Sequence, residues 1–118
     1  MDIATAERAL ALLVAQQSGL ELDRTVRCGG DLPDAAPLVS VRFVSGKTEN
    51  SALSEFVAEV RGVFAEPDEA GAFVAAVWGG LPRYGTAGFT SLAAEGGLEL
   101  AERNGYFTAT GRIRACFA

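Results

Sequence analysis

The sequence contains no histidine, and this absence removes several classes of chemistry. Ser-His-Asp and Cys-His catalytic arrangements need an imidazole as the base, and the commonest zinc sites need it as a ligand. Only two cysteines occur, Cys28 and Cys116, and they form no CxxC pair, so a redox motif or a zinc ribbon is excluded. We expect two separate free thiols, with a disulfide between them as the alternative.

Long hydrophobic runs are also missing. The run from Leu10 to Ala15, for example, is far too short to span a membrane. The start, Met1-Asp2-Ile3, lacks the basic region of a signal peptide. We therefore expect no membrane partner, and we expect the protein to stay in the cytoplasm unless it leaves inside a particle.

The chain is poor in positive charge. Its 10 Lys and Arg residues face 15 Asp and Glu residues, which gives a net charge of −5. An acidic chain gains nothing from counterion release on nucleic acid, so we expect no specific DNA or RNA binding. The 118 residues, 49% of them hydrophobic, suffice for one packed core but not for two. We expect a single domain over residues 1–118.

The first segment with helical periodicity covers residues 4–18, where apolar side chains recur every three or four positions. Asp2 or Thr5 provides an N-cap, and Gly19 provides a stop signal. A long connection follows over residues 20–37. Because so long a loop is unusual in a small domain, we expect it to be functional or mobile.

A second helix is predicted over residues 67–81. Pro67 stands where a first helical turn tolerates proline, and two acidic residues follow it, as suits the positive end of the helix dipole. Its apolar face is continuous. Gly79, Gly80 and Pro82 predict its end.

Two strands are predicted between the helices. Residues 38–44 alternate between apolar and polar side chains. Residues 54–65 fit either a strand or a helix, and we favour the strand because Gly62 is a poor helix former. Residues 46–53 would then link the two strands as a hairpin. The long connection before them has room for one further short strand near residues 25–28.

The end of the chain predicts another hairpin. Asn104-Gly105, a pair favoured by type I′ turns, separates a strand over residues 98–103 from one over residues 106–117. Residues 83–97 are predicted as a second irregular stretch that is rich in glycine.

These elements, in the order α-β-β-α-β-β, predict an α+β fold with an antiparallel or mixed four-stranded sheet and both helices on one face. The other face is then open to solvent or to a partner. Strand alternation assigns eight charged or polar residues to this open face: Arg42, Glu55, Glu59, Arg61, Thr108, Thr110, Arg112 and Arg114.

Three motifs suggest chemistry only in part. Ser45-Gly46-Lys47-Thr48 resembles the end of a phosphate-binding loop, but Val41 occupies the position of the required first glycine. Cys28 has arginines nearby but no base. Acidic pairs such as Glu55 and Glu59 arise by chance in so acidic a chain. We expect no enzyme activity, no cofactor and no metal site.

The order and spacing of the elements resemble those of the tail terminator proteins of long-tailed bacteriophages, which are grouped with minor capsid or tail completion proteins. The resemblance covers most of the chain but includes no specific motif. It consists of the helix over residues 6–17, a loop that reaches Leu32-Pro33-Asp34-Ala35-Ala36-Pro37, the strand 38–44 with Gly46 after it, the segment 55–64, the helix start Pro67-Asp68-Glu69-Ala70 and the terminal hairpin 98–117.

The resemblance implies a structural protein of a phage or prophage. Members of the family form rings, usually hexamers, that cap the finished tail tube and present a surface to the head connector. This implies three partners, namely other copies of the chain, the tail tube protein and the head connector protein. It places the protein in the host cytoplasm during assembly and then in the virion tail. The two long loops are the expected contact regions, with candidate interface residues Arg24, Arg27, Asp31, Asp34, Arg83 and Tyr84.

Three other functions fit the same sequence. The main alternative is a cytosolic module, monomeric or dimeric, that binds a small molecule or a protein. The second is a small enzyme built on acidic residues such as Glu55 and Glu59. The third is a neck or connector protein of the same particle.

Overall fold

The structure is a computed structural model that describes residues 2–29, 35–84 and 88–117. Over these residues the chain forms two helices and five strands. In chain order the elements are α1 (Ile3–Ser18), β1 (Val26–Cys28), β2 (Leu38–Glu49), β3 (Ala52–Phe64), α2 (Pro67–Tyr84), β4 (Phe89–Arg103) and β5 (Tyr106–Phe117).

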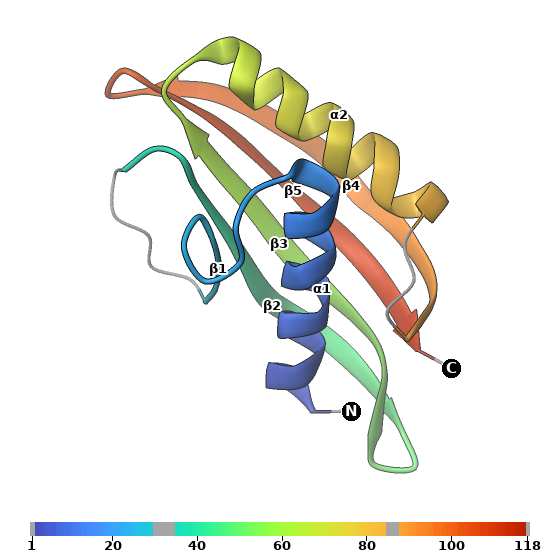
Figure 1. Ribbon diagram of the computed structural model, residues 1–118. Coiled ribbons are helices and arrows are strands. Elements are labelled where there is room, and N and C mark those ends of the chain that lie inside the picture. Colours follow the sequence, from blue (N-terminus) through green and yellow to red (C-terminus); the bar gives the residue numbers. More distant parts are fainter. Residues whose placement is uncertain (1, 30–34, 85–87, 118) are drawn as a thin grey trace.

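The strands form one mixed sheet in the order β1-β2-β3-β5-β4. The pairing of β1 with β2 is parallel, and the other three pairings are antiparallel. Both helices lie side by side on one face of this sheet (Figure 1). The α+β class, the mixed sheet and the one-sided helix layer are confirmed. The four-stranded sheet and the order α-β-β-α-β-β are wrong in detail, because β1 adds a fifth strand before β2.

Helix α1 begins and ends where its sequence signals predict. The backbone N–H of Thr5 donates to the Asp2 side chain at 2.7 Å, which caps one of the unpaired donors of the first turn. Gly19 has a φ of 74° and its N–H donates to Ala15, so it closes the helix in the left-handed conformation that glycine tolerates.

Helix α2 continues beyond its predicted end at residue 81. It passes through Gly79, Gly80 and Pro82 and ends at Tyr84. Val77 and Leu81 are almost fully buried against the sheet. Burying such side chains stabilises the helix by roughly 1.5–3 kcal/mol each, which exceeds the cost of about 1 kcal/mol for each helical glycine.

The segment that was ambiguous in the sequence is strand β3, which lies between β2 and β5. The predicted link over residues 46–53 is wrong, because β2 runs to Glu49 and β3 starts at Ala52. Only Asn50 and Ser51 remain as the turn, with φ values of 53° and 66°. Two successive positive φ values are what a two-residue type I′ hairpin requires.

Strand β4 is also longer than predicted. It begins at Phe89, so most of the irregular stretch expected over residues 83–97 belongs to α2 or β4. A bulge interrupts β4 between Glu95 and Glu99, where Gly96 has a φ of 72°. The glycines that predict a loop instead mark this bulge. The turn between β4 and β5 at Asn104-Gly105 is confirmed.

The core lies between the sheet and the two helices. Phe56 at its centre has no exposed surface. Its ring stacks on Phe43 and Phe117, at centroid distances of 6.1 and 5.6 Å, and meets Phe89 at 6.2 Å. Strand alternation therefore places the large side chains on the helix-covered face and leaves the charged ones on the other.

Candidate functional site

Of the six residues predicted as an interface, the four that the structure places lie in two separate regions. Arg24 and Arg27 lie together at the β1 edge of the sheet, where the Arg27 Nε donates to the Arg24 carbonyl at 3.0 Å. Asp31 and Asp34 lie outside the described residues. Arg83 and Tyr84 end α2, on the opposite side of the molecule from β1, and their side chains are likewise not described (Figure 1).

The backbone edge of β1 is closed by its own turn. The N–H of Val26 donates to the Glu21 carbonyl at 3.0 Å, and the carbonyl of Val26 accepts from Asp23 at 2.8 Å. These bonds use the groups that an outer strand would otherwise offer to a neighbour. At Val26 the β1 edge is therefore closed to strand addition and presents side chains instead.

Exposed ion pairs surround this turn. Arg8 reaches both carboxylate oxygens of Asp23 at 2.8 Å, and Arg24 approaches Glu21 at 3.3 Å. The hydrogen bond from Arg8, followed by its positive charge, lowers the pKa of Asp23. Arg27 makes no ion pair with any carboxylate among the described residues.

An apolar hollow of about 380 Å³ opens beside the same turn. One stripe of α1 forms its wall and Leu22 closes it, so the lining is Thr5, Arg8, Ala9, Leu12 and Leu22. Leu12 is 40% exposed, which is unusual for a large hydrophobic residue in this chain. We refer to this hollow, together with Arg24 and Arg27, as the β1 corner.

The opposite edge of the sheet is β4, and its backbone and side chains are exposed in a different way from those of β1. Among the described residues, no backbone group outside the sheet pairs with β4. Leu98 and Leu100 are 37% and 63% exposed. Glu99 and Glu102 are exposed and form no ion pair with a described cation. We refer to residues 98–102 as the β4 edge.

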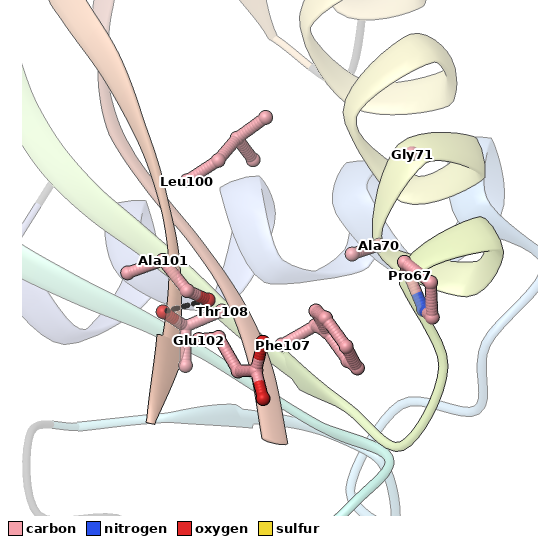
Figure 2. Close-up of a pocket in the computed structure, with 8 residues that line it drawn as sticks. All are labelled: Pro67, Ala70, Gly71, Leu100, Ala101, Glu102, Phe107 and Thr108. Carbon is pink, nitrogen blue, oxygen red and sulfur yellow. Dashed lines mark hydrogen bonds between the residues drawn. The ribbon is translucent and has the colours of Figure 1, made fainter. Parts of the chain in front are cut away.

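A second hollow of about 270 Å³ separates the β4 edge from the start of α2. Figure 2 shows Phe107 and Pro67 on its two sides, with Leu100 reaching away from the sheet. The hydroxyl of Thr108 donates to the Ala101 carbonyl at 3.3 Å and holds the two strands together here. Helix α2 therefore leaves the outer part of β4 uncovered.

The open face of the sheet carries the eight residues assigned to it by alternation, as the strand register confirms. Charges alternate across neighbouring strands. Arg114 lies 3.2 Å from Glu55 and 2.7 Å from Glu95, and the hydrogen bond to Glu95 is the main cause that raises the pKa of Arg114. Its Nε is buried without a hydrogen-bond partner among the described residues. Ion pairs therefore link neighbouring strands across this face.

The motifs that suggested chemistry lack a supporting geometry. Ser45-Gly46-Lys47-Thr48 is part of strand β2 and is not a loop that opens a helix. Partial desolvation, followed by the charge of Glu7, raises the pKa of the Cys28 thiol, whereas a nucleophilic cysteine needs a lowered pKa. Both thiols are free. The described residues contain no group of three or more acids or cysteines placed to hold a metal ion.

Comparisons with known proteins give no family for this chain. No family model matches it, and no curated protein matches it. Over the described part of the chain, neither helix is long and apolar enough to cross a membrane.

Proposed function

We propose that this chain is a structural subunit of a phage or prophage tail, a tail-terminator-like protein that assembles into a ring. The ring caps the end of the tail tube and offers a different surface to the head connector. It acts through surfaces that are complementary to its partners and is not an enzyme. Its partners are its own copies, the tube protein and the connector protein, and its place is the host cytoplasm and then the virion tail.

The observation that carries this proposal is the difference between the two edges of the sheet. The β1 corner is hollow and holds Arg24 and Arg27, whereas the β4 edge projects Leu98 and Leu100 beside two acids. Unlike surfaces on opposite sides of one molecule favour head-to-tail contacts, which close into rings when the rotation between copies allows it.

The dimensions of the chain are compatible with a ring of six. The molecule measures 46 × 27 × 25 Å, and its long axis follows the strands. Six copies with their long axes parallel to the ring axis and centres about 25 Å apart would lie about 25 Å from that axis. The channel left at the centre is then about 25 Å across, which is wide enough for a DNA duplex to pass. A net charge of −5 suits a wall that releases DNA.

The test is the oligomeric state of the purified chain. We expect native mass spectrometry and light scattering to give six copies, and electron microscopy to give rings with a central hole. Adding the rings to a polymerising tail tube protein should stop elongation from one end. A strict monomer or a simple dimer in every condition, including with tube ends present, would contradict the proposal. A gene position between connector and tube protein genes would support it.

A second candidate is a monomeric or dimeric cytosolic module that binds a small molecule or a protein. The hollow of about 270 Å³ between α2 and the β4 edge is the observation in its favour, because it lies near the lower end of the ligand-pocket range. Saturable binding of small apolar probes by a monomeric chain, lost in Phe107→Ala, would favour this function over the ring. A neck protein of the same particle would form the same ring but would bind the connector and leave tube growth unchanged.

A further inference from the structure

The two edges of the sheet match each other at the same height along the strands. Backbone pairing runs from Arg27 on β1 through Ser40, Arg61 and Thr110 to Glu99 on β4. Arg27, a cation, therefore lies at one end of this row of the sheet, and Glu99, an acid, lies at the other. Neither makes an ion pair within the described part of the chain.

The adjacent row has apolar ends. It begins at Leu22, which bridges to Val26, and continues through Val39, Gly62 and Ala109 to Leu100. Leu22 closes the hollow of the β1 corner, and Leu100 is the most exposed of the large hydrophobic residues described. Apolar surface thus faces outward at both ends of one row, and charges of opposite sign face outward at both ends of the next.

We propose that the β4 edge of one copy docks on the β1 corner of the next copy. Leu100 fills the hollow lined by Ala9, Leu12 and Leu22, and Glu99 pairs with Arg27. The occupant is a second copy of this chain, because the hydrophobic and charged groups of the two edges match row by row without any shift along the strands. This inference rests on the proposed ring and names its contact.

The geometry also determines the kind of assembly. The two edges are separated by four strand spacings, or about 19 Å, so they lie on opposite sides of one molecule. Two copies alone cannot satisfy both edges, and the contact repeats head to tail. Because the matched rows need no displacement along the strand axis, the contact allows a flat ring when successive copies rotate about an axis parallel to the strands. The contact uses side chains, since the outward-facing backbone groups of Val26 on β1 are already occupied by the turn.

Cysteine cross-linking tests the contact directly. A chain with Arg27→Cys and Glu99→Cys, and with Cys28→Ser and Cys116→Ser, cannot form a disulfide between positions 27 and 99 within one copy, because disulfides need Cα atoms within about 7 Å. We expect mild oxidation to give a ladder on non-reducing gels that ends at the size of the ring. Glu49→Cys with Arg27→Cys is the matched control, since Glu49 is exposed at the end of β2 and lies on neither outer strand of the sheet, and should give no ladder.

Charge reversal tests the same contact in solution. Arg27→Glu or Glu99→Arg should each raise the concentration needed for assembly about tenfold or more, because like charges then meet across the contact. The double variant should recover most of the loss, whereas Glu49→Arg, away from both outer strands, should change nothing. Leu100→Asp should abolish assembly while circular dichroism shows a folded monomer. Normal rings in Glu99→Arg and Leu100→Asp, together with no cross-link in the chain that carries Arg27→Cys and Glu99→Cys, would overturn the docking. They would not contradict the ring itself. A wild-type chain that never forms rings would overturn both.

Discussion

The two faces of the sheet show how differently the same five strands are used. On the helix-covered face, Phe56, Val60 and Ala58 have no exposed surface, and their neighbours leave little room for change. On the open face, Arg42 pairs with Glu59 and Arg114 pairs with Glu55, and all four side chains keep contact with water. Side-chain volume therefore limits which residues fit on the covered face, whereas side-chain charge limits which residues fit on the open face. The two kinds of constraint predict different responses to mutation.

The largest expected effect is at the centre of the covered face. Phe56→Ala removes a ring that contacts three other aromatic rings, and should lower the free energy of unfolding by about 3–5 kcal/mol. Urea unfolding followed by circular dichroism measures this loss. Arg61→Ala, on the open face of the same strand, is the control and should stay within about 0.5 kcal/mol of the wild type. Equal losses of unfolding free energy in the two variants would show that side-chain volume matters no more on the covered face than on the open face.

A smaller loss is expected at Gly111, which lies on the covered face beneath α2. A Cβ atom there would come within 2.7 Å of the Trp78 ring and 3.0 Å of Leu98. Gly111→Ala should therefore destabilise the protein by about 1–3 kcal/mol through overpacking. Thermal unfolding is the measurement, and Gly111→Ala combined with Trp78→Leu should lose less than the two single changes add up to. An unchanged melting temperature in Gly111→Ala would mean that Trp78 and Leu98 leave room for a methyl group at this position.

Much of this fold is predictable from local pattern. Alternation identifies the open face, and the Asn104-Gly105 turn and the Asp2 cap appear in their expected places because each depends on a few neighbouring residues. Glycines mislead where their role is set by tertiary packing. Gly79 stays helical because Val77 and Leu81 are buried around it, and Gly96 forms a bulge inside a strand.

The candidate site is predictable only in part. Arg24 and Arg27 stand out because they belong to a long loop, and the structure places both at an edge. Glu99 and Leu100 give no such signal, because they look like ordinary strand residues in the sequence. Their importance depends on which strand is outermost and on which row each residue ends, and both follow from the pairing of distant strands.

Replacing glycine by alanine should stabilise the protein, and not destabilise it, on the outer side of α2. A Cβ at Gly79 would meet no atom within 4 Å, and its backbone is helical. Gly79→Ala should therefore stabilise the chain by about 0.5–1 kcal/mol, because alanine loses less conformational entropy in a helix than glycine. Thermal or urea unfolding of the monomeric Leu100→Asp background measures this change without a contribution from assembly. A loss of stability in that background would show that the outer side of α2 is not free.

The smallest expected effect belongs to the open face itself. Arg114 contacts Glu55 and Glu95 at 3.2 and 2.7 Å, but it is partly exposed, so water and salt weaken these attractions. Arg114→Gln should lower the melting temperature slightly at low salt. At about 1 M salt, where the Debye length is about 3 Å, this difference should shrink. Arg103→Gln, which removes an exposed cation that forms no described ion pair, is the matched control and should show no such salt dependence. A loss in Arg114→Gln that stays constant with salt would mean that the side chain acts by packing its stem between the strands, so that volume would constrain this part of the open face as well.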